Sequence, residues 1–216
     1  MLLVNTIFSS IQGEGVYIGY KQLFLRLSAC NLACDYCDEN NSGGQELSNE
    51  SIIKELETLN SSYHHSLSLT GGEPLLQVNE LIKLLPLLKI DKYLETNSTL
   101  PANLGEIKHL ISIFSLDFKP GYEKEFQQSL ELVKNEDTFI KFILHPKQNY
   151  TDLKNALDII QVINKDIPFI LQPVTPHRNI KSMPPGQEII SAYNIAKKKL
   201  NDVRVIPQAH KFMHLT

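Results

Sequence analysis

Short hydrophobic runs alternate with amphipathic stretches along most of the 216-residue chain. The runs are rich in β-branched and aromatic residues, which favour strands, and the stretches between them have the apolar spacing of helices. The strands predicted in this way lie near 21–27, 66–70, 91–95, 111–117, 138–144, 167–172 and 202–206. Strands and helices that alternate along a chain are typical of α/β proteins with a largely parallel sheet.

Two of the predicted helices show a clear apolar face and a candidate N-terminal cap. The first follows Ser48 and carries Ile52, Ile53, Leu56 and Leu59 on one side. The second follows Thr151 and carries Leu153, Leu157, Ile160 and Ile163. Ser and Thr are favoured caps because their side-chain oxygens accept hydrogen bonds from the first helical N–H groups. We expect these helices to cover the sheet.

The chain is too short for a complete eightfold barrel. Such a barrel takes about 250 residues, more than remain here once the N-terminal segment 1–20 and the tail 207–216 are set aside. The sequence therefore predicts an α/β fold that forms an incomplete, open (β/α) barrel, with one domain over residues 1–216.

Composition and charge narrow the range of partners. The chain has 21 Lys and Arg against 24 Asp and Glu, a formal charge of -3, so no basic excess indicates a nucleic-acid-binding protein. It has no basic and apolar leader and no run near the roughly 18 apolar residues of a membrane span. We expect a cytoplasmic protein with a small-molecule or protein substrate and no membrane partner.

The three cysteines lie close together, directly after the predicted strand 21–27. Cys30, Cys34 and Cys37 have C-x3-C-x2-C spacing, and three thiolates on one loop can each hold an iron of a four-iron cluster. Because the chain has no fourth cysteine, one iron would be open to another ligand. From spacing alone, a structural zinc with a further ligand and unligated core cysteines remain alternatives.

This cysteine spacing resembles the signature of the radical S-adenosylmethionine (SAM) superfamily. The resemblance implies a [4Fe-4S] cluster whose open iron binds SAM, with one-electron cleavage that yields a 5′-deoxyadenosyl radical. Two other elements are similar to the superfamily: the aromatic Tyr36 before the third cysteine, and the run Thr70-Gly71-Gly72-Glu73-Pro74. A Gly-Gly pair alone would indicate only a loop after a strand.

Further segments resemble one family within this superfamily, 7-carboxy-7-deazaguanine synthase. They lie in the same order along almost the whole chain, at 10–15, 24–27, 30–32, 69–75, 94–99, 117–120, 171–173 and 203–211. The resemblance implies a lyase of queuosine and 7-deazapurine biosynthesis. Such an enzyme converts 6-carboxy-5,6,7,8-tetrahydropterin into 7-carboxy-7-deazaguanine by radical ring contraction with loss of ammonia. It also implies Mg²⁺, regeneration of SAM, a homodimer, and an electron donor such as flavodoxin or ferredoxin.

The resemblance also assigns roles to individual residues. Substrate contacts are expected from the segment 1–20, the strand ends and the tail 207–216, through Ile11, Gln12, Gly13, Arg26, Thr70, His210 and Thr216. Contacts with SAM are expected from Tyr36, Cys37, Asp38, Gly72, Glu73, Ser115, Asp117 and Lys119, and which of the last three touches it stays open. Glu39 stands where typical members have Thr or Ser, and we expect its carboxylate to bind the magnesium directly or through a water. The alternatives are that Glu39 turns outward as a solvated loop charge, with Asn40 or water at the metal, or that the enzyme works without magnesium.

Position along the barrel supports several of these assignments, since barrel enzymes build their sites at the C-terminal ends of strands. Arg26, Glu95, Gln172 and Gln208 map there together with the cysteines and the segments 70–73 and 115–119. Arg26 is the best candidate for a bidentate carboxylate clamp, and its alternative is a surface ion pair. For His210 the alternative is an ordinary, partly exposed residue near the end of the chain.

Two other functions compete with this interpretation. An activase that installs a glycyl radical on a partner protein would share the cysteine loop and the glycine run, but would not need the turn 12–15 or Arg26. A non-catalytic electron carrier would call for four cysteines.

Overall fold

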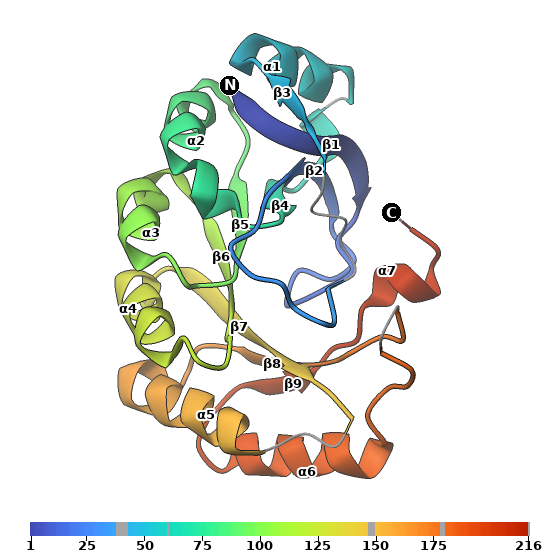
Figure 1. Cartoon of the computed structure of the whole chain (residues 1–216), viewed down its shortest axis with the longest axis vertical. Helices are drawn as coiled ribbons and strands as arrows, with labels where there is room; N and C mark the ends of the chain where they lie inside the picture. Colours follow the sequence, from blue (N-terminus) through green and yellow to red (C-terminus); the bar gives the residue numbers. More distant parts are fainter. Residues whose placement is uncertain (38–42, 60, 147–149, 178–179, 216) are drawn as a thin grey trace.

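The protein is described here by a computed structural model that covers residues 1–37, 43–59, 61–146, 150–177 and 180–215. Within these residues nine strands form one open sheet, in the order β3-β1-β2-β4-β5-β6-β7-β8-β9. Figure 1 shows a curved sheet with most of the helices on its outer side. The strands are β1 (Leu2–Ile11), β2 (Lys21–Leu27), β3 (Gln45–Leu47), β4 (Leu67–Gly71), β5 (Lys92–Thr96), β6 (Ile113–Asp117), β7 (Asp137–Leu144), β8 (Phe169–Pro173) and β9 (Val203–Val205).

Neighbouring strands from β2 to β9 pair in parallel, whereas β1 runs antiparallel to both β2 and β3. This arrangement confirms the predicted open barrel, and the seven predicted strands are present with ends shifted by no more than 2 residues. Strands β1 and β3 were not predicted. The segment 1–20, expected only to contact substrate, thus also supplies a ten-residue strand.

The helices are α1 (Asn49–Thr58), α2 (Val78–Leu84), α3 (Pro101–Ile107), α4 (Glu123–Val133), α5 (Tyr150–Asn164), α6 (Gly186–Lys197) and α7 (Ala209–Phe212). Short 3₁₀ turns lie at Ser61–Tyr63, Pro74–Gln77, Leu85–Leu87 and Lys108–Leu110. The predicted cap at Ser48 is confirmed, because its hydroxyl accepts from the N–H of Ser51. The predicted cap at Thr151 is wrong. Tyr150 packs against the core and is already helical, so Thr151 lies inside α5.

The two faces of the sheet have different side chains. The outer face carries the main apolar core beneath the helices, with buried residues such as Leu25, Leu69 and Phe114. The inner face has a small apolar cluster early in the strands, formed by Tyr93, Ile113, Phe139 and Ile170 and closed by Val16 and Tyr17 from the segment after β1. Tyr17 also donates a hydrogen bond to Asp137.

Two residues further along each of these strands, the inner face becomes polar. Because side chains in a strand point to the same face at every second position, Glu95, Ser115, Lys141 and Gln172 follow directly after the members of the apolar cluster. The C-terminal half of the barrel interior is therefore built to hold a polar ligand. Of the helices in the described ranges, none combines the length and apolar character needed to cross a bilayer.

Candidate active site

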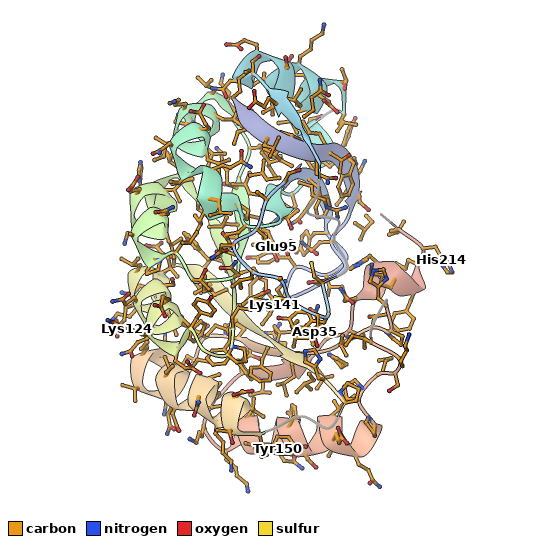
Figure 2. The ribbon with its side chains drawn as sticks, in the orientation of Figure 1. Asp35, Glu95, Lys124, Lys141, Tyr150 and His214 are labelled. Atoms are coloured by element: carbon orange, nitrogen blue, oxygen red, sulfur yellow. The ribbon has the colours of Figure 1, made fainter. Side chains whose placement is uncertain are left out.

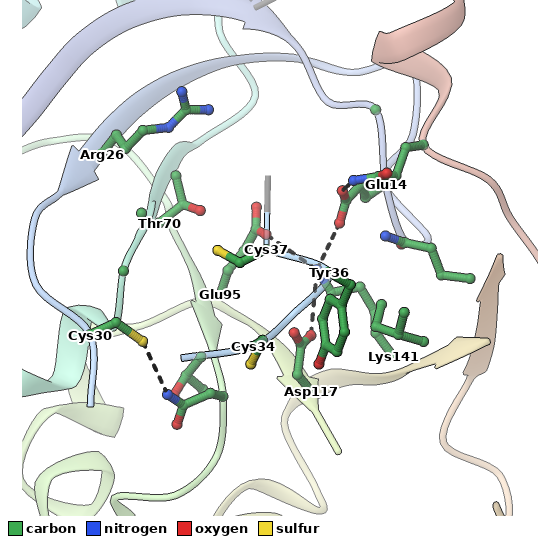
Figure 3. A pocket seen from close by; sticks show the side chains of 18 of the residues that line it. Glu14, Arg26, Cys30, Cys34, Tyr36, Cys37, Thr70, Glu95, Asp117 and Lys141 are labelled. Atoms are coloured by element: carbon green, nitrogen blue, oxygen red, sulfur yellow. Dashed lines mark hydrogen bonds and ion pairs between the residues drawn. The ribbon is translucent and has the colours of Figure 1, made fainter. Parts of the chain in front are cut away.

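A cavity of about 200 Å³ lies at the C-terminal ends of the strands (Figure 3). Its walls come from β1, β2, the cysteine loop, strands β4 to β8 and the C-terminal segment. Most residues expected to bind substrate or cofactor line it: Ile11, Gln12, Gly13, Arg26, Cys30, Cys34, Tyr36, Cys37, Thr70, Gly72, Asp117, Lys119 and His210. The structure thus brings together residues from 11 to 210 in one cavity.

Two expected SAM contacts lie behind this surface, and three further predicted site residues lie outside the described part of the chain. Among the described lining residues neither Glu73 nor Ser115 appears, and both side chains are fully buried. Asp38, Glu39 and Thr216 lie outside the described residues. The roles predicted for these five residues stay predictions.

Glu73 ties the end of β4 to the end of β5. Its carboxylate accepts hydrogen bonds from the N–H of Leu75 at 3.0 Å, the hydroxyl of Thr96 at 2.8 Å and the N–H of Asn97 at 2.7 Å. Burial raises the pKa of Glu73 to about 7, although these hydrogen bonds act in the opposite direction. Through Asn97, Glu73 supports the cysteine loop, because the Asn97 amide donates to Asn31 at 2.9 Å and lies 4.0 Å from the sulfur of Cys30.

The three cysteines are free thiols of intermediate exposure on the same loop. The N–H of Leu32 donates to the Cys30 sulfur at 3.5 Å, and such donors stabilise a thiolate ligand. Burial raises the pKa of the Cys30 thiol, and nearby Glu73, Cys34 and Cys37 add to this effect. A positively charged metal group that binds the thiolates would offset this cost.

Two glycines at the end of β4 allow this loop to pack tightly. A Cβ on Gly72 would lie 1.8 Å from the carbonyl oxygen of Ala29, and a Cβ on Gly71 would lie 2.1 Å from that of Leu27. The N–H of Gly72 donates to the Leu27 carbonyl at 3.0 Å, and the N–H of Glu73 donates to the Ala29 carbonyl at 2.9 Å. The glycines therefore seat the cysteine loop on β4.

These observations fit an iron–sulfur cluster better than a single ion. The donor set consists of three neighbouring cysteine thiols that line one cavity, of which Cys30 accepts from an N–H group, without a fourth cysteine in the chain. Within the described segments, no group of three His, Cys, Asp or Glu side chains could hold one metal ion.

Arg26 lies on the cavity wall near the end of β2. Its guanidinium carbon is 4.9 Å from the centre of the Phe8 ring, and Phe8 stacks on Phe24 with ring centres 4.8 Å apart. Thr70 is the parallel-strand neighbour of Arg26 on β4, and Figure 3 shows both side chains on one wall. Because all four residues line the cavity, Arg26 is available to an anionic ligand there.

Gln12 builds the turn after β1. Its backbone N–H donates to Tyr20 and its carbonyl accepts from Gly19, each at 2.8 Å. Its side-chain amide donates to Gln22 at 3.0 Å and to Glu95 at 3.2 Å, and accepts from the N–H of Glu14 at 3.0 Å. Gln12 faces the cavity, but these bonds already engage its polar groups with residues of the turn, β2 and β5.

A buried lysine that the sequence analysis did not identify lies at the centre of the cavity floor. Lys141 on β7 forms ion pairs with Glu14 at 2.9 Å, Glu95 at 3.3 Å and Asp117 at 3.5 Å (Figures 2 and 3). Burial raises the pKa of Glu14, but the opposite effect of Lys141 and of a hydrogen bond from Gln208 is larger. The pKa of Glu14 is therefore lowered to about 2. Burial lowers the pKa of Lys141, whereas the three carboxylates raise it well above its usual range. Glu14 and Lys141 are therefore both charged at neutral pH.

A second ion pair joins this floor to the cysteine loop. The ammonium of Lys119 donates to Asp117 at 3.0 Å and to the hydroxyl of Tyr36 at 2.9 Å. Burial raises the pKa of Tyr36 to about 12, so the phenol remains protonated at neutral pH. Tyr36 directly precedes Cys37, which places this pair beside the cluster ligands.

The C-terminal segment closes the cavity over the N-terminal turn (Figure 1). The side chain of Gln208 donates to Glu14 at 2.9 Å, and the N–H of Ala209 donates to the carbonyl of Gly13 at 2.9 Å. His210 packs directly on Gly13, because a Cβ added at Gly13 would lie 2.3 Å from the Nδ1 atom of His210. His210 therefore lines the cavity and is not a free surface residue.

Comparisons with known proteins agree with this geometry. Residues 26–171 match the radical SAM superfamily. The chain is 34% identical to a 7-carboxy-7-deazaguanine synthase from Geobacter sulfurreducens, with 97% of this chain and 96% of that protein covered. It is 31% identical to one from Methanocaldococcus jannaschii, with 98% and 99% covered. A crystal structure of QueE from Escherichia coli has a TM-score of 0.67 at 19% identity, covers 97% of this chain and 94% of that chain, and bears on the fold alone.

Proposed function

The chain belongs to the 7-carboxy-7-deazaguanine synthase family of the radical SAM superfamily, and we propose on this basis that its cavity is the site of a radical ring contraction. The enzyme is a lyase that converts 6-carboxy-5,6,7,8-tetrahydropterin into 7-carboxy-7-deazaguanine with loss of ammonia, in 7-deazapurine biosynthesis. One observation carries the proposal: the three cysteines, Arg26 and the turn after β1 line the same cavity.

The cysteine side of the cavity is proposed to hold the cofactors. Cys30, Cys34 and Cys37 would hold a [4Fe-4S] cluster, which together with SAM would supply the 5′-deoxyadenosyl radical. Tyr36 and Gly72 lie on this side, next to Asp117 and Lys119, and these residues contact SAM. The protein's own contribution is to orient the pterin carbon and to exclude water.

The opposite side is proposed to hold the pterin. Arg26, supported by the Phe8 ring, binds the substrate carboxylate through two parallel N–H groups, with Thr70 beside it. The N–H groups of the aminopyrimidine face the carboxylates of Glu14 and Glu95, since the polar groups of Gln12 are engaged with residues of the turn, β2 and β5. Ile11, Gly13 and His210 complete the wall, and Thr216 is proposed to add a contact.

The proposal extends to groups that the cavity alone does not identify. Mg²⁺ is proposed to bind the carboxylate of Glu39 and the substrate, because magnesium prefers hard oxygen ligands. Flavodoxin or ferredoxin would deliver the electron to the cluster. We also propose a homodimer of single-domain chains in the cytoplasm, where a reducing environment keeps clustered cysteines available for a metal group.

The test is anaerobic reconstitution of the cluster followed by addition of the tetrahydropterin, SAM and a reductant. We expect a 7-deazapurine product with its own ultraviolet absorbance, and SAM that is not consumed in proportion to product. A pterin without the 6-carboxylate is the matched control, because it removes only the partner of Arg26. Intact cluster and SAM binding without 7-deazapurine formation would refute the proposed reaction.

The two competing functions receive less support. A glycyl-radical activase does not need the Arg26 wall or the turn after β1, and the relatives that match nearly the whole chain are 7-carboxy-7-deazaguanine synthases. An electron carrier would need its cluster closed by a fourth cysteine, which the chain does not have.

A further inference from the structure

Lys141 joins three carboxylates from three separate parts of the chain. Its side chain is 5% exposed, and its ammonium lies 2.9 Å from Glu14 in the turn after β1, 3.3 Å from Glu95 on β5 and 3.5 Å from Asp117 on β6. The ammonium donates hydrogen bonds to Glu14 and Glu95, and its contact with Asp117 is an ion pair without a hydrogen bond. A change in any one contact therefore shifts the position of the ammonium relative to the other two.

The contacts of Lys141 continue on both sides of the cavity. On the substrate side, Glu95 also accepts from the side chains of Gln12 and Ser68, each at 3.2 Å. On the cofactor side, Asp117 accepts from Lys119 at 3.0 Å, and Lys119 donates to the Tyr36 hydroxyl at 2.9 Å. This chain of polar contacts crosses the cavity floor, and Figure 3 shows its central part, the ion pairs of Lys141 with Glu14, Glu95 and Asp117. It connects the proposed pterin wall with the residue next to Cys37.

Resting on the proposed function, we infer that Lys141 is a positioning residue that couples the binding of the pterin to the binding of SAM. A ligand whose N–H groups engage Glu14 or Glu95 fixes these carboxylates and, through them, the ammonium. Asp117 and Lys119 are then held in place before SAM arrives. Because the second ligand binds partners that are already ordered, each ligand strengthens the binding of the other.

The charges of the residues in this chain of polar contacts explain why a lysine is needed at position 141. Glu14, Glu95 and Asp117 carry three negative charges, and Lys119 and Lys141 carry two positive charges. Without Lys141, Glu14 and Glu95 lose the only ion pair described for each of them here, and the carboxylates on the two sides of the cavity lose their common partner. The two ligand sites would then be separate.

The test is an equilibrium binding cycle on cluster-reconstituted enzyme without reductant, so that no turnover occurs. Titration calorimetry gives the Kd of the tetrahydropterin with and without saturating SAM, and the Kd of SAM with and without the tetrahydropterin. In the wild type we expect each ligand to tighten the other by the same factor, roughly 10-fold, within the usual range of coupling. Lys141→Met should reduce this factor to below about 2, and Lys141→Arg, which keeps the charge, should retain part of it.

Two further variants make the result specific. Lys124→Met changes an exposed lysine on α4 and should keep the wild-type factor. Glu14→Gln removes the ion pair to Lys141 from the substrate side and should lower the factor at least threefold, so it decides the question if Lys141→Met does not hold a full cluster. Iron analysis of every variant verifies cluster content.

Three outcomes would overturn an inference. A factor of 1 in the wild type, or a wild-type factor in both Lys141→Met and Glu14→Gln, refutes the role of Lys141 and leaves the proposed reaction untouched. If the tetrahydropterin does not bind the wild type at all, the proposed function fails instead.

Discussion

Replacing Glu14 with Gln tests the buried charges by their effect on folding. The carboxylate is 15% exposed and accepts from Lys141 and from Gln208, each at 2.9 Å. These contacts lower the pKa of Glu14 from 4.5 to about 2. A lowering of this size corresponds to roughly 3 kcal/mol of stabilisation. Because Gln keeps the shape and one acceptor oxygen, we expect Glu14→Gln to reduce the free energy of unfolding by about 2 to 3 kcal/mol at pH 7.

The pH dependence gives this prediction its sign. The pKa of Glu14 is lower in the folded than in the unfolded protein, so the stabilisation is complete above about pH 4.5 and is lost as the pH falls toward 2. Urea unfolding of the cluster-free protein at pH 7, 5.5, 4.5 and 3.5 should show the wild type and the variant converging at low pH. Glu106→Gln, on the exposed side of α3, is the control and should differ from the wild type by less than about 0.5 kcal/mol at pH 7. A difference in the free energy of unfolding between the wild type and Glu14→Gln of less than about 0.5 kcal/mol at pH 7 would refute the argument. A difference as large at pH 3.5 as at pH 7 would also refute it.

Four further predictions concern the cofactor and substrate sides. Arg26→Lys should raise the Kd of the tetrahydropterin by roughly 10-fold or more, because a point charge cannot form the bidentate contact. Cleavage of SAM without substrate should continue in this variant. An unchanged Kd would exclude Arg26 as the carboxylate clamp. Gly72→Ala should lower thermal stability and cluster content, because the new Cβ would meet the carbonyl of Ala29. The control Gly105→Ala in α3 should change neither, because its Cβ would lie 3.9 Å from the nearest atom. Glu39→Ala should raise the magnesium concentration that turnover requires, and Glu39→Thr should bring this concentration back down. Identical magnesium titrations of the wild type and both variants would show that Glu39 takes no part in magnesium binding. Iron analysis should find no four-iron cluster after Ala replaces any one of Cys30, Cys34 or Cys37.

Most of the barrel could be predicted because its signal is local. Strands β4 to β8 are short apolar runs between amphipathic helices, and an apolar run of this kind identifies a buried parallel strand on its own. Strand β1 lacks this signal, since Asn5, Thr6, Ser9 and Ser10 interrupt its apolar residues. Its position depends on pairing with β2 and β3, which the sequence does not show.

The same difference separates the predicted and unpredicted parts of the site. The cysteine loop has its three thiols within eight positions, so the spacing indicated a candidate metal site and the resemblance to radical SAM enzymes pointed to a cluster. Phe8 contacts Arg26 only because β1 pairs with β2, and Lys141 meets Asp117 because these residues are opposite each other on β6 and β7. A lysine in the apolar run 138–144 was nevertheless a usable signal, because a charged residue rarely enters a central strand without a partner.

The contact between the C-terminal segment and the turn after β1 has a consequence for how the enzyme is made. Gln208 and Glu14 are 194 positions apart, so the cavity wall is incomplete until residue 208 has left the ribosome. The cysteine loop is synthesised far earlier and must remain accessible to the iron-delivery machinery during that interval. A tag or truncation near residues 206–215 would therefore act on the last step of maturation, after the barrel itself has folded.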